Sequence, residues 1–333
     1  MNPSFSDVRA DDLPQVAMPT PSVAGLSVVT PEVFGLDLGA WEIFQQPRFV
    51  DIYARHFGSR VVAHHGVLVF ARSVPGLGLI RTQVYSPEAG AGVDWHRILT
   101  DLPTGRIEVM TNAPTPASVA KPISPPDLNS FIIDLRPGIE GLYERLESRT
   151  RKAIHRAQRQ NMTVRVTQDA PDLTKFHEVL LRVTRGGTVY HAPDLTLLQA
   201  IMRAGFARLY VMEHGGQIVG GAFLLVNRYS HGYVSVFDRH ACDGLPGNLL
   251  YWGVAQGEIE AKMPFLDLGA QCLSAHPGIT TAKRGFSPHL VPAYRYELAP
   301  SRWRATIGDA WQWLKRPKVQ APPAPTKVTA EPD

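Results

Sequence analysis

Two carboxylates in the second half of the chain are the side chains best suited to accept a proton from a reacting group. Asp238 ends one predicted strand and Asp267 lies in the next. Tyr233, at the start of the first of these strands, and Tyr251 carry hydroxyl groups that can donate a hydrogen bond to a leaving group. Because a carboxylate at the end of a strand can equally cap a loop, both interpretations stay open for Asp238 and Asp267.

A loop that runs into a helix supplies a candidate site for an anion. Gly244, Gly247 and Asn248 stand where a predicted loop enters the predicted helix 246–262. The N–H groups at such a helix end and the positive end of the helix dipole favour phosphate or carboxylate. We expect these three residues to bind the anionic part of a co-substrate. The alternative is a plain turn before a helix that begins at Pro246.

A basic helix is the second candidate for anion binding. Apolar residues return every three or four positions from Gly138 to Asn161, which predicts one helix with a single buried stripe. An RNA backbone or a pyrophosphate-linked precursor would suit the basic face that remains. The alternative is a solvated face that Glu144 and Glu147 partly neutralise. The residues that we expect to bind an anionic substrate here are Arg149, Arg151, Lys152 and Arg156.

Two further basic residues follow the predicted strand that ends at Leu268. Lys283 and Arg284 stand in a predicted loop bounded by glycines. An arginine can bind phosphate with two parallel hydrogen bonds. An exposed loop also carries basic residues simply for solubility, so the residue types alone leave the two interpretations open.

The chain lacks the residue patterns that several kinds of chemistry require. There are two cysteines and no CxxC, so neither a disulfide framework nor a thiolate zinc site is expected. Among the 12 histidines only His64 and His65 are close together, without HExxH or His-x-His, so we expect no catalytic metal. Gly76-x-Gly78 has Arg81 where a dinucleotide fingerprint needs a third glycine. The sequence also offers no Ser-His-Asp or Cys-His nucleophile.

Length and composition are typical of a globular protein with two domains. The chain has 333 residues, more than the ~100–200 of one ordinary domain. Apolar residues make up 44% and charged residues 19%, which supports a buried core in each domain. The net charge of +4 favours anionic partners such as phosphates, nucleic acid or an acidic membrane surface. The two cysteines fit a reducing cytoplasm, and because neither a signal peptide nor an apolar run of about 18 residues is seen, no membrane-spanning helix is expected.

Short strands and helices alternate along the chain, which predicts a mixed α+β fold. In the first half, strands are predicted near 61–71, 79–85, 106–111 and 131–135, with helices from Pro47 and over 93–102. We divide the chain into a flexible leader over 1–24, a first domain over 25–135, a second domain over 136–300, a helix over 301–316 and a disordered tail over 317–333.

The order of elements from Asp172 to Phe286 resembles that of one family. The predicted order is helix, helix, hairpin, strand, loop and helix, strand, basic loop. The stretches that mark it are Leu209-Tyr-Val-Met-Glu-His-Gly-Gly-Gln-Ile-Val-Gly-Gly-Ala-Phe-Leu-Leu, Gly247-Asn-Leu-Leu-Tyr-Trp, Phe265-Leu-Asp-Leu-Gly and Lys283-Arg-Gly-Phe, preceded by Arg149-Thr-Arg-Lys-Ala-Ile-His-Arg-Ala. They resemble the GNAT-like domain of FemA/FemB-type peptidoglycan-bridge aminoacyltransferases and of the related BioF2-like acyltransferases. The resemblance covers residues 130–298 and is faint over 25–130.

The resemblance implies a fold and an activity. The fold would be GNAT-like, with two tandem domains of which the N-terminal one is degenerate. The activity would be transfer of an acyl or aminoacyl group from acyl-CoA or aminoacyl-tRNA to an amine of a cell-envelope precursor or a similar anionic acceptor. The amine would attack directly, without a tightly bound cofactor. In the family a lysine that corresponds to Lys283 contacts the acidic substrate or stabilises the transition state, and Arg284 would assist it.

One stretch departs from the GNAT pattern and leaves the donor open. GNAT acetyltransferases cradle the coenzyme A pyrophosphate with Arg/Gln-x-x-Gly-x-Gly/Ala, whereas this chain has Arg239-His-Ala-Cys-Asp-Gly-Leu-Pro-Gly-Asn. Two alternatives therefore remain: a non-catalytic protein that binds RNA or another anion on a GNAT fold, and a small-molecule N-acetyltransferase. The helix predicted over 302–315 combines tryptophans with basic residues, which would suit either a peripheral contact with anionic lipid or the edge of the second domain.

Overall fold

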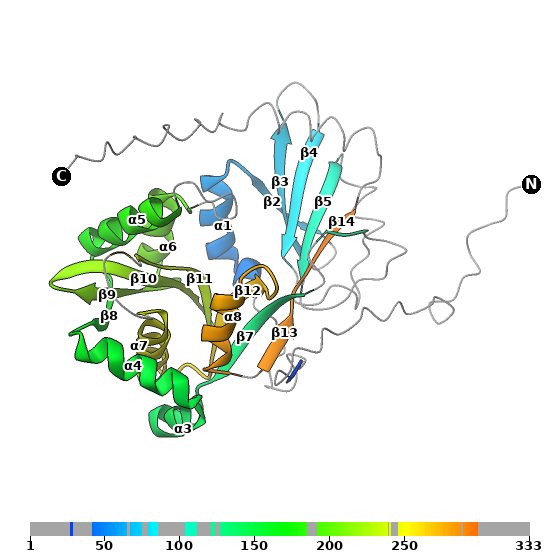
Figure 1. Ribbon diagram of the computed structural model, residues 1–333. Helices are drawn as coiled ribbons and strands as arrows, with labels where there is room; N and C mark the ends of the chain where they lie inside the picture. Colours follow the sequence, from blue (N-terminus) through cyan, green and yellow to red (C-terminus); the bar gives the residue numbers. More distant parts are fainter. Residues whose placement is uncertain are drawn as a thin grey trace, which may run out of the picture.

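The computed structural model describes residues 27–28, 42–64, 67–74, 79–85, 104–111, 121–123, 127–184, 192–238, 240, 246–287 and 289–298. The predicted leader, the helix predicted over 93–102, the C-terminal helix and the tail lie outside these residues, as does Gly244. The described residues form two β-sheets and the helices that cover them (Figure 1).

The larger sheet has eight strands in the order β1-β13-β7-β12-β11-β10-β9-β8. Its strands are β1 (Ser27–Val28), β7 (Leu128–Asp134), β8 (Thr163–Thr167), β9 (Ala207–His214), β10 (Gln217–Val226), β11 (Ser230–Phe237), β12 (Phe265–Cys272) and β13 (His289–Pro292). Neighbours from β8 to β11 are antiparallel, whereas β11 and β12 are parallel. The smaller sheet, in the order β2-β3-β4-β5-β14-β6, consists of β2 (Arg60–His64), β3 (Val67–Val74), β4 (Leu79–Tyr85), β5 (Thr104–Thr111), β6 (Lys121–Pro122) and β14 (Tyr294–Leu298).

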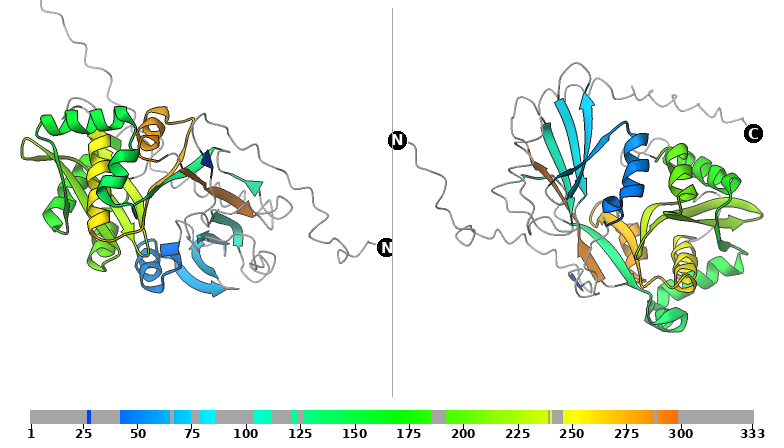
Figure 2. Two further views of the ribbon diagram at one scale, coloured as in Figure 1. Left: turned by 90° about the horizontal axis from the view of Figure 1, so that it is seen from below. Right: turned by 180° about the vertical axis from the view of Figure 1, so that it is seen from behind.

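Helices cover both faces of the larger sheet. They are the 3-10 helix η3 (Glu42–Gln45), α1 (Pro47–His56), α3 (Gly138–Arg145), α4 (Ser148–Arg159), α5 (Ala170–Thr184), α6 (Leu195–Arg203), α7 (Pro246–Glu260) and α8 (Pro277–Arg284). Side chains alternate between the faces of a strand, so each face has its own core. One core joins the sheet to α3, α4 and α7, and the other joins it to α1, α5 and α6 (Figure 1). Phe70 of β3 belongs to the second core, which places α1 between the two sheets (Figure 2).

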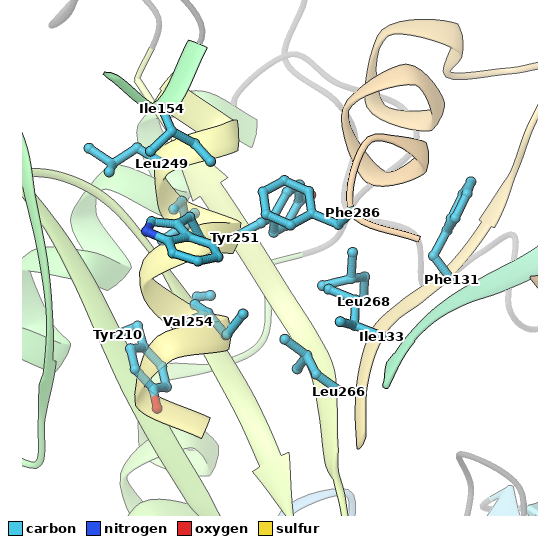
Figure 3. Close-up of a cluster of buried hydrophobic side chains, with 14 of the residues drawn as sticks. Phe131, Ile133, Ile154, Tyr210, Leu249, Tyr251, Val254, Leu266, Leu268 and Phe286 are labelled. Atoms are coloured by element: carbon cyan, nitrogen blue, oxygen red, sulfur yellow. The ribbon is translucent and has the colours of Figure 1, made fainter. Parts of the chain in front are cut away.

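Helix α7 lies at the centre of the first core, among Tyr210 of β9 and Leu266 of β12 (Figure 3). Two glycines one turn apart allow it to approach the sheet closely. A Cβ on Gly253 would lie 2.5 Å from the side chain of Val164, and one on Gly257 would lie 2.5 Å from the hydroxyl oxygen of Tyr210. Because larger side chains at these positions would push α7 outward, the glycines fix its height above β8 and β9.

A buried carboxylate near the end of α7 ties the same helix to the sheet. Glu258 is fully buried and accepts hydrogen bonds from Arg208 and Tyr210 of β9 and from Ser230 of β11. Burial and the nearby charge of Glu258 raise the pKa of Tyr210. A buried charge is tolerated when it is both paired and hydrogen-bonded, and Glu258 meets both conditions.

The two sheets exchange strands. β7 comes from the segment predicted as the first domain and lies between β12 and β13 of the larger sheet. β14 comes from the segment predicted as the second domain and pairs with β5 of the smaller sheet. Only Ala293 separates β13 from β14, so the chain crosses between the sheets at this residue. The division between residues 135 and 136 remains a prediction, and strands from both sides of it are interleaved.

The helix predicted over 138–161 is two helices, α3 and α4. The chain breaks at Leu146 and Glu147, whose ψ angles are 140° and 141°. The guanidinium of Arg151 donates hydrogen bonds to three carbonyl oxygens at the end of α3, which satisfies groups that a helix end leaves without partners. The prediction of one helix was wrong because the apolar spacing continues across the break and does not reveal this capping contact.

Candidate functional site

β11 and β12 are neighbours over a short distance only. They pair at two positions, Ser230 with Leu266 and His231 with Asp267. Each strand then continues, β11 to Phe237 and β12 to Cys272, and no further pairs form between these described strands. Two parallel strands that part in this way line a gap with backbone N–H and C=O groups, which are strong hydrogen-bonding groups.

Two glycines mark the point where the strands part. A Cβ on Gly269 would lie 2.8 Å from the carbonyl oxygen of Gly232, and one on Gly232 would lie 3.1 Å from the carbonyl carbon of Leu268. Gly269 has a φ of +82°, a left-handed conformation that glycine adopts readily. Its N–H donates to Oδ1 of Asp267 at 2.7 Å, so the carboxylate holds this turn of the backbone in place.

His231 and Asp267 form a buried pair at the last rung before the gap. Nδ1 of His231 lies 3.0 Å from Oδ2 of Asp267, and their side chains are 8% and 0% exposed. Asp267 was predicted as a site residue, but His231 was not. A histidine in a strand, directly before a glycine, was the available signal, and its partner lies 36 residues further along the chain.

Lys283 reaches the same place from α8. The residue is 5% exposed, and its Nζ donates to the carbonyl oxygens of Leu268 and Gly269 at 2.7 and 3.0 Å. Burial lowers the pKa of Lys283 to about 8, and the charge of Asp267 opposes this shift. The loop predicted around Lys283 was wrong, because Pro277 starts a helix that holds the lysine in its last turn.

The start of α7 contains two of the three glycine and asparagine residues predicted to bind an anion. Gly247 and Asn248 are both buried, and the Oδ1 atom of Asn248 is a buried acceptor that has no hydrogen-bond partner among the described residues. A Cβ on Gly247 would lie 3.0 Å from the ring of Phe237, so the end of β11 packs directly against this helix end. The third residue, Gly244, lies outside the described residues.

The structure brings Arg149 and Arg284 together around one carboxylate. Glu147 lies 2.7 Å from Nε of Arg149 and 3.5 Å from Nε of Arg284. Arg149 also donates to the carbonyl oxygen of Thr281 at 3.5 Å. These contacts join the start of α4 to α8, which carries Lys283.

The exposed surface of α4 carries a row of cations. Lys152, Arg156 and Arg159 are exposed and follow Arg149 at spacings of three and four residues, which puts all four on one side of the helix. We call these four residues the basic stripe. Arg151 points elsewhere, since its guanidinium caps α3 and lies over the ring of Tyr143.

Asp238 lies apart from the buried pair, and Tyr233 lies in a bulge of β11. Asp238 follows β11 seven residues after His231, which is about 20 Å along an extended strand. The backbone N–H of His240 and the guanidinium of Arg182 lower the pKa of Asp238, and Arg182 lies 3.0 Å away. Tyr233 is the extra residue of a bulge in β11, because Phe223 pairs with Val234 and Leu224 with Gly232.

Neither a metal centre nor a membrane-spanning helix is found among the described residues. No group of three histidine, cysteine, aspartate or glutamate side chains among them is arranged to hold a metal ion. No helix among them is both long enough and apolar enough to cross a bilayer.

Comparison with known proteins identifies the class of the second half. Residues 145–277 match the family described as "Acetyltransferase (GNAT) domain". The fold is similar to that of FemX, with a TM-score of 0.59 and 12% identity over 86% of this chain and 99% of that one. It is also similar to the C-terminal domain of a putative lysylphosphatidylglycerol synthetase from Agrobacterium fabrum (TM-score 0.54, 14% identity, 83% and 95% covered) and to L-PGS from Bacillus licheniformis (0.54, 13%, 86% and 98%). A search of curated protein sequences finds no match.

The match to the GNAT domain thus covers residues 145–277, and the solved structures show that the fold around them is shared. The predicted mixed α+β, GNAT-like fold is confirmed. The predicted resemblance to FemA/FemB-type proteins is confirmed for the fold, since FemX aligns over 86% of the chain.

Proposed function

We propose that this protein transfers an acyl or aminoacyl group from an activated donor to an amine of a cell-envelope precursor or a similar anionic acceptor. The observation that carries the proposal is the parting of β11 and β12 beside the buried ammonium group of Lys283. Acyl transfer needs a place for the donor carbonyl and a positive group near its developing oxyanion. The gap and Lys283 supply these two features.

Lys283 has one hydrogen-bond donor left for a substrate. A protonated lysine has three N–H groups, and those of Lys283 meet two acceptors in the described part of the chain, both of them carbonyl oxygens. The side chain is buried, so an electrostatic interaction with an oxyanion there is stronger than in water. We assign Lys283 the role of stabilising the negative charge that forms when the amine attacks.

The start of α7 is the proposed site for an anionic group of the donor. The first N–H groups of a helix have no partners within the helix and attract phosphate. Asn248 adds a buried polar side chain whose Oδ1 has no hydrogen-bond partner in the part of the chain that the structure describes. α7 follows the end of β11, so a donor held there by a phosphate would extend its acyl group along the gap.

Aminoacyl-tRNA is the donor that we propose to test first. The basic stripe offers four cations in a row on the exposed side of α4, and α4 joins α8 through Glu147. A nucleic acid backbone is the ligand that a row of this kind suits, because each neutralised phosphate releases counterions. Acyl-CoA remains the other donor class, and the same assay separates the two.

The proposed acceptor is anionic and belongs to the cell envelope. One protein of similar fold is named a putative lysylphosphatidylglycerol synthetase, which supports an anionic envelope lipid or a related precursor as the acceptor. Arg284 is partly exposed beside Lys283 in sequence and shares Glu147 with Arg149, which would allow it to turn toward an acceptor phosphate. We expect the protein to work at the inner side of the envelope as a peripheral protein.

A donor screen tests the proposal. The purified protein would be incubated with radiolabelled acetyl-CoA or with a mixture of labelled aminoacyl-tRNAs, in the presence of an envelope extract that contains peptidoglycan precursors and phospholipids. We expect label to pass from aminoacyl-tRNA to an acceptor in a product that resists mild base as an amide does. Transfer from acetyl-CoA alone would make the protein an N-acetyltransferase. Absence of transfer from both donors would overturn the proposal.

The basic stripe also favours a second candidate, an RNA-binding or anion-binding protein without turnover. This protein would bind RNA with a steep dependence on salt and would transfer nothing. Binding by filter retention, run beside the transfer assay, distinguishes the two functions, since only the enzyme consumes the donor.

A further inference from the structure

We propose that Arg149 and Arg284 form a binding site for a phosphate group, and that the carboxylate of Glu147 occupies this site until such a group displaces it. The inference rests on the proposed function for its role and deepens it, since it gives the anionic acceptor a phosphate and a place beside Lys283. Glu147 is then an internal competitor for the site.

The start of α4 and the end of α8 form the frame of this site. The N–H of Glu147 donates to the carbonyl oxygen of Gly285 at 3.2 Å. A Cβ on Gly285 would overlap the hydroxyl group of Thr150, which is buried, so the two helices touch here. Arg149 directly precedes Thr150 and Arg284 directly precedes Gly285. The contact between the helices therefore holds the backbones of both arginines close together.

The two guanidinium groups share the carboxylate of Glu147 unequally. Nε of Arg149 lies 2.7 Å from Oε2, whereas Nε of Arg284 lies 3.5 Å from Oε1. The Nε atom of Arg284 is buried and has no hydrogen-bond partner among the described residues. Buried polar groups are normally hydrogen-bonded. This N–H thus indicates an acceptor that Glu147 does not supply.

Positive charge exceeds negative charge at this place. Two guanidinium groups face one carboxylate, which leaves a surplus of one positive charge among these three side chains. The positive end of the α4 dipole adds to it, because the side chain of Glu147, the residue before the helix, makes no capping hydrogen bond. The site therefore suits an anion that carries more than one charge.

A phosphate group satisfies both arginines better than a carboxylate does. It carries up to about two negative charges and about three acceptor oxygens, and a guanidinium binds it through two parallel N–H groups. The side chains of Arg149 and Glu147 are 50% and 39% exposed, and ion pairs as exposed as this contribute little to stability. Displacement of Glu147 therefore costs little. The carboxylate excludes singly charged anions and yields to phosphate.

The site lies beside the proposed place of acyl transfer. Arg284 directly follows Lys283, whose Nζ donates to the carbonyl oxygens of Leu268 and Gly269 at the gap. An acceptor whose phosphate is bound by Arg284 is thus held next to the lysine, with its amine free to enter the gap. The proposed acceptor is a molecule that carries a phosphate group as well as the amine.

The test is the affinity of the full chain for pyrophosphate, measured by isothermal titration calorimetry at fixed ionic strength. Glu147→Gln keeps the size of the side chain and removes the competing charge, so we expect it to bind pyrophosphate roughly 10-fold more tightly than the wild type. Adding Arg284→Gln to this variant should abolish the gain, because the phosphate then loses a charge-assisted hydrogen bond. This second variant separates the site from any other anion site on the protein.

Glu144→Gln is the matched control. Glu144 is an exposed carboxylate on α3, three residues before Glu147, and it lies outside the described ion pairs of the two arginines. Its replacement removes the same charge from the same region and should leave the affinity for pyrophosphate at the wild-type value. Equal affinities of Glu147→Gln and Glu144→Gln would overturn the inference, as would a gain that survives the loss of Arg284.

Vesicles of phosphatidylglycerol, used in the same comparison, identify the source of the phosphate. Tighter vesicle binding by Glu147→Gln assigns the site to a lipid headgroup, and a gain for pyrophosphate alone assigns it to a soluble molecule. Because no donor is needed, the phosphate site stands if the wild type transfers nothing, and only the proposed function then fails. Transfer by the wild type without any gain in Glu147→Gln would remove the site and leave the proposed function intact.

Discussion

Gly232 and Gly269 touch across the point where β11 and β12 part. A Cβ on Gly269 would come within 2.8 Å of the carbonyl oxygen of Gly232, and Gly269 has a φ of +82°. Both features require glycine at position 269, because a side chain there would be strained by its backbone and would also press on the neighbouring strand. The geometry of the gap thus depends on a residue that has no side chain to take part in chemistry.

Gly269→Ala should therefore destabilise the protein and disturb the gap. We expect the free energy of unfolding to fall by about 2 kcal/mol or more, from backbone strain together with the contact to Gly232. Chemical denaturation measures this change. Gly278→Ala is the control, because Gly278 stands in α8 and a Cβ added there would meet no described atom within 4 Å outside its own stretch of helix. Equal stability of the two variants would contradict the proposed constraint.

The buried lysine predicts a rise in stability at alkaline pH. Burial lowers the pKa of Lys283 to about 8 from the ordinary lysine value of 10.5. Between these values the folded protein loses a proton that the unfolded chain keeps, so stability increases with pH across this window. The gain amounts to about 3 kcal/mol when the shift is converted at 1.36 kcal/mol per pKa unit.

Lys283→Met isolates this effect from other titrating groups. The wild type should gain stability relative to Lys283→Met from pH 8 to pH 10.5, as measured by urea denaturation at fixed ionic strength. Parallel curves for the two proteins over this range would show that the pKa of Lys283 is not lowered in the folded state.

Replacing Glu258, the buried carboxylate near the end of α7, should lower the stability of the protein strongly. Glu258→Ala removes the partner of Arg208, Tyr210 and Ser230 and leaves a partly buried guanidinium without its counter-charge. Breaking a buried ion pair in this way costs about 3–5 kcal/mol. Glu260→Ala, two residues further along and exposed, should change the free energy of unfolding by less than about 0.5 kcal/mol. A small effect at both positions would refute the role assigned to Glu258.

The basic stripe predicts a loss of RNA affinity that depends on salt. Lys152→Gln combined with Arg156→Gln should weaken tRNA binding and reduce the slope of log K against log salt by about 1 for each lost phosphate contact. Lys175→Gln combined with Arg203→Gln removes the same charge from other helices and should leave the slope unchanged. If both pairs weaken binding equally, net charge explains the affinity and the stripe does not.

Arg151 lies on α4 but outside the basic stripe, so its replacement should affect stability and leave RNA binding unchanged. Its guanidinium caps α3 through three carbonyl oxygens, one of them 2.8 Å away on Leu146. Arg151→Gln should therefore lower the thermal unfolding temperature and leave tRNA affinity close to that of the wild type. The reverse pattern would place Arg151 in the binding surface.

The regular elements of the second half could be predicted because their patterns are local. The hairpin of β9 and β10, with Gly215 and Gly216 at its turn, and the helices α5, α6 and α7 all follow from apolar spacing and turn residues within short windows. The same method missed α8, since Pro277 and Gly278 are also typical of loops.

The site was harder to predict because its contacts join distant parts of the chain. Asp267 and Lys283 were selected separately, and only the fold brings His231 to Asp267 across 36 residues. Nothing in the sequence marks Glu258 as a buried residue, since a glutamate near the end of a helix is usually solvated. Residue types thus identified some of the side chains in the gap, but their partners depend on how β11, β12 and α8 meet.

The single-turnover transfer of label from aminoacyl-tRNA by the wild type and by Lys283→Met tests the central claim most directly. The account predicts that the wild type forms a labelled amide product and that Lys283→Met binds tRNA with the same affinity but transfers at least about 100-fold more slowly, because the oxyanion has lost its cation. Equal rates for the two proteins, or no transfer by a folded wild type with either donor class, would contradict it.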